Sequence, residues 1–243
     1  MLWADRARIL SAAGMKPDPW QADLLRSDHD RVLMLASRQS GKSQTAAALA
    51  LHTALLEPPA LVLLLSPALR QSGELFRDKV LPLWKALGRP SRERPPTQLS
   101  LELANGSRII SLPGEEGTIR GFSGVKMLVI DEAARVPDSL YHAVRPMLAV
   151  SHGRLVALSL AYAKQGWFYE AWTGPAAWQR VKITALDCPR ITKEFLEEER
   201  ATMPAQFFAM KYLCEFGEAT DAVFRLEDLQ AATSERIPPL FGA

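Results

Sequence analysis

Residues 32–43 read VLMLASRQSGKS, a short apolar run followed by a polar loop that ends in Gly41-Lys42-Ser43. An apolar strand that enters a helix through such a loop is typical of a phosphate-binding loop. Backbone N–H groups at the helix N-terminus surround a phosphate there, while the lysine reaches its oxygens. The usual pattern, GxxxxGK[ST], begins with glycine, and here that position is Ala36. The stretch predicts a buried strand, a triphosphate-binding loop and a helix over residues 43–56.

A second motif, MLVIDEAAR at residues 127–135, reads as a buried strand that ends in adjacent carboxylates, Asp131 and Glu132. The strand delivers Asp131 to the carboxyl edge of a sheet, where it holds Mg²⁺ through water, and Glu132 orients and deprotonates the attacking water. Lys42 would reach the phosphate oxygens and the Ser43 hydroxyl would ligate Mg²⁺. Together the motifs predict ATP hydrolysis. A base beside the metal ligand indicates the additional-strand branch of P-loop ATPases and fits kinases and GTPases less well.

Strand and helix signals alternate along the chain, which predicts a parallel sheet with crossover helices. The Asn105-Gly106 pair between two alternating segments predicts the tight turn of a β-hairpin. The predicted class is an α/β P-loop NTPase of the additional-strand (ASCE) type, with a mainly parallel central sheet flanked by helices. Residues 1–187 form the predicted ATPase core, and residues 188–243 a small helical C-terminal lid or linker. The predicted strands are 32–36, 61–65, 98–103, 107–112, 127–131, 154–160 and 180–185, and the predicted helices are 43–56, 70–87, 139–148, 193–202 and 204–212.

Composition excludes several classes of protein. The chain has 243 residues and a formal charge of +2, and residues 191–243 carry five Lys and Arg against ten Asp and Glu, so the rest is basic. A basic core is compatible with a nucleic-acid partner and equally with a mixed solvated surface. Cys188 and Cys214 lie outside any CxxC or His-rich context, which indicates neither a disulfide framework nor a zinc site, in a reducing cytosol. No apolar run approaches the ~18 residues of a membrane span, so we expect a soluble protein without membrane contact.

Three further features match one family. Trp20-Gln21 lies upstream of the loop, and the loop itself contains the unusual sequence Ser37-Arg38-Gln39-Ser40. The segments TIRGFSGVKMLVIDEAARVPD and GWFYEAW occupy residues 118–138 and 166–172. With the two motifs above, these features resemble the corresponding segments of viral large terminase subunits, the motors that pump DNA into procapsids. That family tolerates Ala36 in its loop, and the resemblance extends over roughly residues 18–229.

The resemblance implies roles for individual residues. Gln21 matches a glutamine motif whose amide pairs with the edge of adenine. Arg120 matches the arginine that reaches into a neighbouring subunit's site and stabilises the charge of the transferring phosphoryl group, whereas Arg38 is the alternative, an arginine that acts in its own subunit. Ser43 and Asp131 are the predicted magnesium ligands. The predicted catalytic residues are Glu132, Arg120, Lys42 and Arg38, and the predicted ATP-binding residues are Gln21, Ser37, Arg38, Gln39, Ser40, Gly41, Lys42, Ser43 and Gln44.

One segment departs from the family pattern. Where the family usually has Ser-Thr-Pro followed by glycine and basic residues, residues 159–165 read SLAYAKQ. In the family this motif couples the state of the γ-phosphate to DNA movement, so Ser159 is the predicted coupling residue. Because Thr and Pro are lost, two alternatives stay open. The chain could be a decayed prophage copy in which hydrolysis is uncoupled from DNA movement, or a nucleotide-binding structural subunit without turnover. A helicase-like DNA translocase is a further alternative, but it would need a second recombinase-like domain for which no space remains.

The resemblance also implies partners and a location. The partners are double-stranded DNA, a portal protein, a small terminase subunit and further copies of the chain in a ring, which is a pentamer in the family. The location is the cytoplasm of an infected or lysogenic bacterial host, transiently on the procapsid.

Several arginines are candidates for contact with DNA. Arg70 and Arg77 lie seven residues apart on one predicted helix, and this face fits contact with phosphates and a solvated surface equally well. The candidate contacts to DNA phosphates, which need no sequence reading, are Arg70, Arg77, Arg89, Arg92 and Arg94.

Members of the family usually continue into an RNase H-like nuclease domain whose clustered Asp and Glu bind two metals. Few residues follow Gly217, and Asp221, Glu227 and Asp228 are interpreted as residues of a tail helix rather than as nuclease ligands. We therefore expect the ATPase half of such a protein, either excised or a short form, without nuclease activity.

Overall fold

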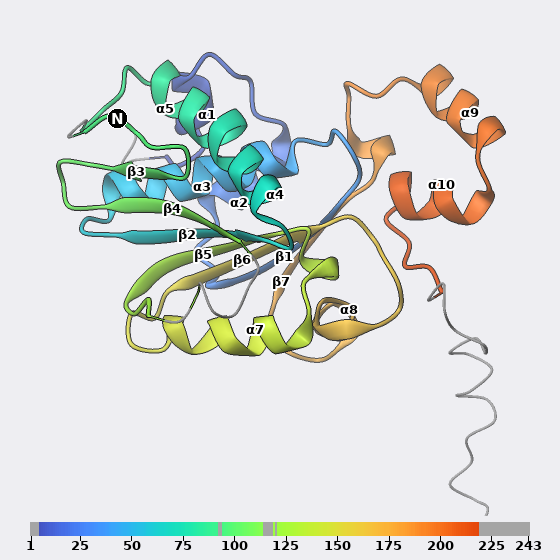
Figure 1. Ribbon diagram of the computed structural model, residues 1–243. Coiled ribbons are helices and arrows are strands. Elements are labelled where there is room, and N and C mark those ends of the chain that lie inside the picture. The colour runs from blue at the N-terminus through green and yellow to red at the C-terminus, as the bar shows by residue number, and fades with distance from the viewer. Residues whose placement is uncertain (1–4, 92–93, 114–118, 120, 219–243) are drawn as a thin grey trace, which may run out of the picture.

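The computed structural model describes residues 5–91, 94–113, 119 and 121–218, and it shows a central sheet between two layers of helices (Figure 1). The strands are β1 (Arg31–Ala36), β2 (Leu61–Ser66), β3 (Ser100–Glu102), β4 (Arg108–Pro113), β5 (Val125–Asp131), β6 (Arg154–Ser159) and β7 (Gln179–Ile183). The α-helices of the described residues are α1 (Arg8–Ala12), α2 (Pro19–Arg26), α3 (Lys42–Leu56), α4 (Leu69–Leu75), α5 (Leu81–Ala86), α7 (Asp138–Val144), α8 (Gly166–Thr173), α9 (Lys193–Thr202) and α10 (Ala205–Tyr212). Short helical segments are η2 (Phe76–Val80), η3 (Ala133–Arg135), η4 (Arg145–Leu148) and η5 (Ala185–Asp187).

The sheet has seven strands in the order β3-β4-β2-β5-β6-β1-β7. Neighbouring strands are parallel throughout, except that β3 pairs with β4 antiparallel. Strand β6 lies between β1, which enters the phosphate loop, and β5, which ends in Asp131. An extra strand between these two is the defining feature of the additional-strand branch, so the predicted fold class and the mainly parallel sheet are confirmed.

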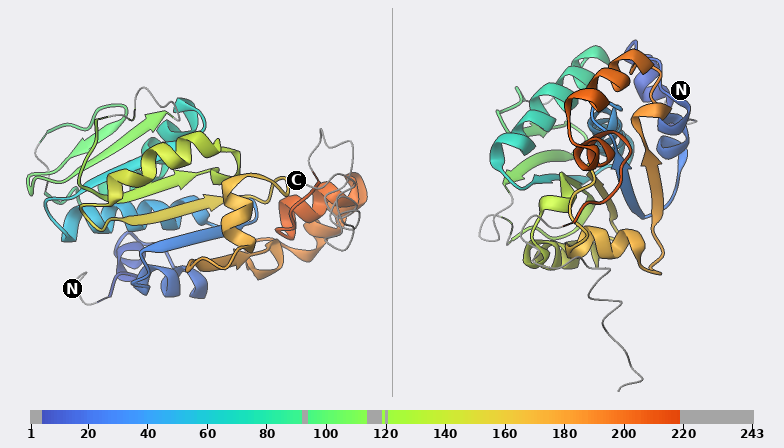
Figure 2. Two further views of the ribbon diagram at one scale, coloured as in Figure 1. Left: turned by 90° about the horizontal axis from the view of Figure 1, so that it is seen from below. Right: turned by 90° about the vertical axis from the view of Figure 1, so that its right-hand side faces the viewer.

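The two faces of the sheet bury alternate residues of each central strand. In β1, Val32 and Met34 pack in the core under helices α1 to α5, whereas Leu33 and Leu35 pack in the core under α7 and α8. Figure 2 shows the same two layers from other directions. Successive side chains of a strand point to opposite faces, and both faces are covered by helices. This explains why the strands read as continuous apolar runs rather than as alternating ones.

Helix α3 is buried almost all round and fixes the position of the phosphate loop. Its residues from Thr45 to Ala54 are buried, and it packs against α2, η2 and β5. Full burial of a side chain such as Leu51 stabilises the folded state by about 1.5–3 kcal/mol. The N-terminus of α3 is therefore held by the core of the protein rather than by the loop itself.

The predicted hairpin and the predicted helix over residues 70–87 are both present, and the helix differs in its detail. The hairpin forms around Gly106, whose φ is +81°, and Leu101 pairs with Ile109. The helix expected over residues 70–87 consists of α4, the wider turn η2 and α5. Pro82 lies at the start of α5 and has no amide hydrogen to donate, so the turn before it cannot keep the regular α-helical bonding pattern.

Helices α9 and α10 form a small unit beside the carboxyl ends of the strands (Figures 1 and 2). They share a hydrophobic cluster of their own, made of Ala185, Leu196, Phe208 and Tyr212. The predicted boundary after residue 187 falls between η5 and α9. Residues 219–243 of the predicted lid lie outside the described residues. Within the described part of the chain, no helix combines the length and the apolar character that crossing a membrane requires.

Candidate active site

The phosphate loop and the carboxylates predicted to act with it meet at the carboxyl edge of the sheet. Strands β1, β6 and β5 are adjacent and parallel, and Leu35 pairs with Ser159 while Asp131 pairs with Leu158. The residues that follow these strands therefore emerge side by side, as ligand-binding residues do in open α/β sheets. The phosphate loop, the Asp131-Glu132 pair and Ser159 form one group.

Two hydrogen bonds fix the first part of the phosphate loop, one to strand β7 and one within the loop. The Ser37 amide donates to the carbonyl of Ile183 at 2.8 Å, and the Ser40 hydroxyl donates to the carbonyl of Ser37 at 2.8 Å. Gly41 has φ +97°, and a Cβ there would lie 2.8 Å from Gln21 Nε2, so only glycine fits both the backbone and the space. Ala36 is the last residue of β1, where ordinary strand geometry gives no reason for a glycine.

Lys42, Asp131 and Glu132 form the charged centre of the group. Lys42 Nζ lies 3.8 Å from Glu132 Oε1. Burial raises the pKa of Asp131 to about 6, and the neighbouring charge of Glu132 adds to this rise whereas Lys42 opposes it. The Glu132 amide donates to Asp131 Oδ1 at 2.9 Å. Glu132 has φ +51°, an uncommon value for a residue other than glycine, and this turn carries the chain sharply from β5 into η3.

Ser159 contacts the turn that carries Glu132. Its buried hydroxyl accepts a hydrogen bond from the Ala134 amide at 3.2 Å. The divergent segment that follows pairs with the chain leaving α10, since the Gly217 amide donates to the Tyr162 carbonyl at 2.8 Å and the Lys164 amide donates to the Gly217 carbonyl at 2.9 Å. The segment after Ser159 therefore joins the sheet edge to the end of the helical unit.

A cavity of about 540 Å³ opens beside this group. Arg38, Glu132 and Ser159 line it from the sheet edge, and Gln206 and Lys211 line it from α10. The Arg38 amide also contacts the Lys211 carbonyl at 3.5 Å. The residues of α10 carry no motif, so no sequence signal points to them; only the packing of α10 over the loop brings them to the site.

Gln21 and Gln44 lie on the other side of the loop. They line a second cavity, of about 300 Å³, with Leu10, Met15, Lys16, Gly41 and Arg190. The Gln21 amide nitrogen donates to Thr45 Oγ1 at 2.9 Å and to the Gly41 carbonyl at 3.4 Å, and its oxygen accepts from the Asp18 amide at 2.9 Å. In this arrangement the Gln21 amide braces the loop, and it would have to exchange partners to pair with adenine.

Arg190 is a neighbour of the loop that sequence reasoning missed. Its guanidinium donates to both carboxylate oxygens of Asp18, at 2.8 and 2.7 Å, and to the Ser40 carbonyl at 3.1 Å. This pairing raises the pKa of Arg190. Asp18 precedes α2 and Arg190 precedes α9, so no local sequence pattern connects them.

Oxygen ligands suitable for Mg²⁺ are present. Asp131 is the last residue of β5 and Ser43 lies in the first turn of α3, and Mg²⁺ prefers one or two protein oxygens together with substrate phosphates and water. Among the described residues there is no cluster of three or more His, Cys, Asp or Glu side chains that could hold a metal ion. The donor set thus fits a metal that arrives with a phosphate ligand.

Several predicted residues are outside the described part of the chain or are not among the residues of this group. Arg120 and Arg92 fall outside the described residues, as do Asp221, Glu227 and Asp228. Among the candidate DNA contacts, Arg70 Nε donates to Glu74 at 2.8 Å, and Arg94 lies 3.8 Å from Glu102. Both of these arginines are exposed and already face a carboxylate.

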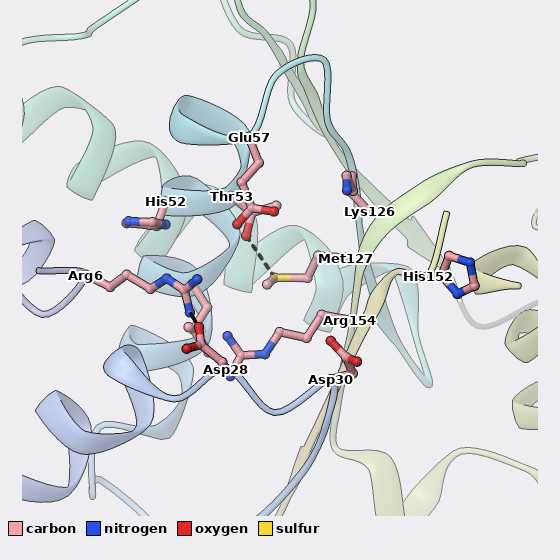
Figure 3. A pocket seen from close by; sticks show the side chains of 11 residues that line it. Arg6, Asp28, Asp30, His52, Thr53, Glu57, Lys126, Met127, His152 and Arg154 are labelled. Atoms are coloured by element: carbon pink, nitrogen blue, oxygen red, sulfur yellow. Dashed lines mark hydrogen bonds and ion pairs between the residues drawn. The ribbon is translucent and has the colours of Figure 1, made fainter. Parts of the chain in front are cut away.

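A separate cavity of about 200 Å³ lies at the opposite, amino edge of the sheet (Figure 3). Its lining carries charges of both signs, including the Arg6–Asp28 ion pair of 2.7 Å. Nε and Nη2 of Arg154 are buried there without a hydrogen-bond partner among the described residues. None of the predicted site residues lines this cavity, and it is separated from them by the length of the strands.

Known proteins share this sequence pattern and this fold. The sequence profile of the family described as "Terminase large subunit, T4likevirus-type, N-terminal" matches residues 33–231. The large terminase ATPase domain of Thermus phage P74-26 has the same fold, with a TM-score of 0.74 at 22% identity over 86% of this chain and 97% of that chain. Among curated proteins, no sequence matches this chain.

A longer relative extends the comparison. The large terminase of another thermophilic bacteriophage has a TM-score of 0.61 at 16% identity, over 87% of this chain and 52% of that chain. Structures of that protein exist in complex with ADP and with ATP-gamma-S. The chain therefore spans about half the length of this second terminase.

Proposed function

The chain belongs to the terminase large subunit family as its N-terminal domain, and on this basis we propose that it hydrolyses ATP with Mg²⁺ to drive double-stranded DNA into a viral procapsid. Its role is that of a packaging ATPase motor. The observation that supports hydrolysis most directly is the convergence of Lys42, Asp131 and Glu132 at one sheet edge, beside a loop shaped for phosphate.

Each residue of this group has a distinct task in the proposal. Lys42 binds the β- and γ-phosphate oxygens, and Ser43 and Asp131 supply oxygens for Mg²⁺. Bound Mg²⁺ neutralises charge on the phosphates. Glu132 orients and deprotonates the attacking water. The 3.8 Å contact between Lys42 and Glu132 is then a resting pair that triphosphate binding separates, which releases the carboxylate for its role as base.

Two arginines are candidates for stabilising the transition state. Arg38 lines the same cavity as Glu132 and belongs to the same subunit. Arg120 would come from a neighbouring subunit, as in the family, and it is the residue we favour. The expected result is that Arg120→Ala abolishes turnover while ATP still binds. Retained activity in Arg120→Ala together with loss of activity in Arg38→Ala would reverse the assignment.

The decisive experiment compares phosphate release by the wild-type chain and by Glu132→Gln, with DNA present and at high protein concentration. Removing a general base slows a reaction by about 10²–10⁴-fold, whereas the amide keeps the shape of the side chain. We expect turnover in the wild type, a loss of that size in the variant, and unchanged binding of a fluorescent ATP analogue. Binding without turnover in both proteins would instead favour the non-hydrolysing structural subunit.

The partners are part of the same proposal. Double-stranded DNA, a portal protein, a small terminase subunit and a ring of identical chains are those of a packaging motor, acting in the bacterial cytoplasm and on the procapsid. Exposed arginines such as Arg77 and Arg89 would contact DNA phosphates without reading sequence. Binding of this kind weakens steeply as salt rises, so a salt titration of DNA affinity tests it. An affinity that does not change with salt would remove phosphate contact from the proposal.

A further inference from the structure

Three successive carbonyls of the phosphate loop accept hydrogen bonds from side chains outside the loop. The Cys188 thiol contacts the Gln39 carbonyl at 3.8 Å between sulfur and oxygen. Arg190 Nη2 donates to the Ser40 carbonyl at 3.1 Å, and Gln21 Nε2 donates to the Gly41 carbonyl at 3.4 Å. Two of these three donors come from residues 188–190, the segment that leads from η5 into α9.

The direction of a carbonyl sets the direction of the next amide. In a planar trans peptide, the C=O of one residue and the N–H of the following residue point to opposite sides. With the carbonyls of residues 39–41 directed towards their donors, the amides of Ser40, Gly41 and Lys42 point the other way. None of these three amides donates a hydrogen bond to another described residue. Successive backbone N–H groups directed to one side form an anion-binding concavity.

Arg190 is the strongest of the three donors because it is charged and because its guanidinium is held in a fixed orientation. The guanidinium holds both oxygens of Asp18 in a bidentate pair, and the Asp18 side chain is only 8% exposed. Bidentate pairs of this kind add geometric definition as well as energy. The third bond, to the Ser40 carbonyl, therefore comes from an oriented cation, whereas the Cys188 thiol is a weak donor.

We propose that Arg190 is a positioning residue for the phosphate loop: together with Asp18 it fixes the Ser40–Gly41 peptide and so sets the affinity of the loop for the phosphates of ADP and ATP. This inference rests on the proposed function, which places those phosphates in the loop. Because Arg190 immediately precedes the helical unit of α9 and α10, a movement of that unit that withdraws Arg190 weakens phosphate binding. Phosphate affinity is then tied to the position of the lid.

The test is a binding titration of Arg190→Gln with ADP and with inorganic pyrophosphate, which has phosphates but no base. A hydrogen bond from a charged donor is worth enough to change affinity about tenfold or more. We expect the dissociation constants for both probes to rise about tenfold and the KM for ATP to rise similarly, with kcat at saturating ATP changed less than about threefold. Arg190→Lys keeps the charge and should recover part of the affinity.

Arg26→Gln is the matched control. Arg26 makes the same kind of bidentate pair, with Asp5 at 2.9 and 2.8 Å, on helix α2 but away from the loop. Its loss should leave ADP and pyrophosphate binding unchanged. If Arg190→Gln is unfolded by circular dichroism, Asp18→Asn serves in its place, because it frees the guanidinium and should weaken both probes as well.

The outcomes separate the two proposals. If the wild-type chain binds ADP and folded Arg190→Gln binds it with the same affinity, the positioning role is overturned and the proposed function is left intact. A wild-type chain that binds neither ADP nor pyrophosphate overturns the proposed function itself. A loss confined to ADP, with pyrophosphate affinity unchanged, would mean that Arg190 acts on the base through the neighbouring cavity, which also contradicts the positioning role.

Discussion

Arg190 and Arg154 lie at opposite edges of the same sheet and have opposite surroundings. At the carboxyl edge, the guanidinium of Arg190 faces three acceptors, two on Asp18 and one on the phosphate loop. At the amino edge, Arg154 has two buried nitrogens without a partner among the described residues, and burial lowers its pKa. An arginine side chain thus organises a loop at one edge, whereas at the other edge its buried nitrogens lack hydrogen-bond partners among the described residues.

The difference follows from how the two edges are built. At the carboxyl edge, parallel strands end beside one another and a helix begins, so backbone amides and side chains converge on one volume. At the amino edge, the cavity is lined by Asp28, Asp30 and Glu57 together with Arg6 and Lys126, which are charges of both signs without a common direction. Charge alone does not mark a site; oriented donors around a common volume do.

The largest contrast is expected between two lysines, one at each edge. Lys42→Ala removes the ammonium that binds the phosphate oxygens, and a charged hydrogen bond of about 1.5–3 kcal/mol corresponds to roughly a tenfold to hundredfold loss of ATP affinity. Turnover should become undetectable. Lys126→Ala, in the lining of the amino-edge cavity, should leave both properties within about twofold. Titration with a fluorescent ATP analogue and a phosphate-release assay measure the two effects; similar losses in both variants would contradict the contrast between the edges.

A second contrast concerns the buried carboxylate Asp131. Its folded pKa of about 6 lies above the usual 3.8, so its contribution to stability is complete below pH 3.8 and is lost as the pH rises through 6. Asp131→Asn stays neutral, and without Mg²⁺ it should raise the free energy of unfolding by up to about 3 kcal/mol at pH 7.5 and by well under ~1 kcal/mol near pH 4. Urea unfolding in EDTA at the two pH values measures this. A gain that does not depend on pH would show that the Asp131 carboxyl is not desolvated.

The smallest effect is expected at the amino edge itself. Arg154→Leu replaces a poorly compensated charge by an apolar side chain, and such replacements are often neutral or stabilising. We expect the free energy of unfolding to rise by about 1 kcal/mol, with ADP affinity unchanged, in contrast to the loss of affinity expected for Arg190→Gln. Urea denaturation and an ADP titration provide the readouts. A marked loss of stability would show that Asp28, Asp30 or Glu57 pairs with Arg154 in solution.

Much of the fold could be predicted from the sequence because its signals are local. The strand before the phosphate loop, the strand before Asp131 and the turn at Gly106 all lie where the pattern placed them. Lys42 also lies beside Glu132, as two motifs at the same sheet edge predict, since Glu132 directly follows β5 and Lys42 follows the loop after the parallel strand β1. The roles given to Arg120 and to the other site residues stay predictions.

Other parts of the site depend on contacts between distant segments. The position of Gln21 upstream of the loop predicts an adenine-binding residue, but its amide contacts Thr45, Gly41 and the Asp18 backbone. Helix α10 contributes Gln206 and Lys211 to the cavity beside Glu132 without any motif. A side chain's partners depend on which surfaces pack together, and spacing along the chain does not contain that information.

Local sequence was sufficient for the additional-strand fold and for the residues that would handle phosphate and metal, because strand patterns and helix starts are set by neighbouring residues. The bracing of the phosphate loop, in contrast, arises only when the chain folds. The loop carbonyls face donors from residues 21, 188 and 190, of which the first comes from α2 and the other two from the segment after β7. Hydrogen bonds need donor and acceptor close together and in the right direction, and that condition is met in space rather than along the chain.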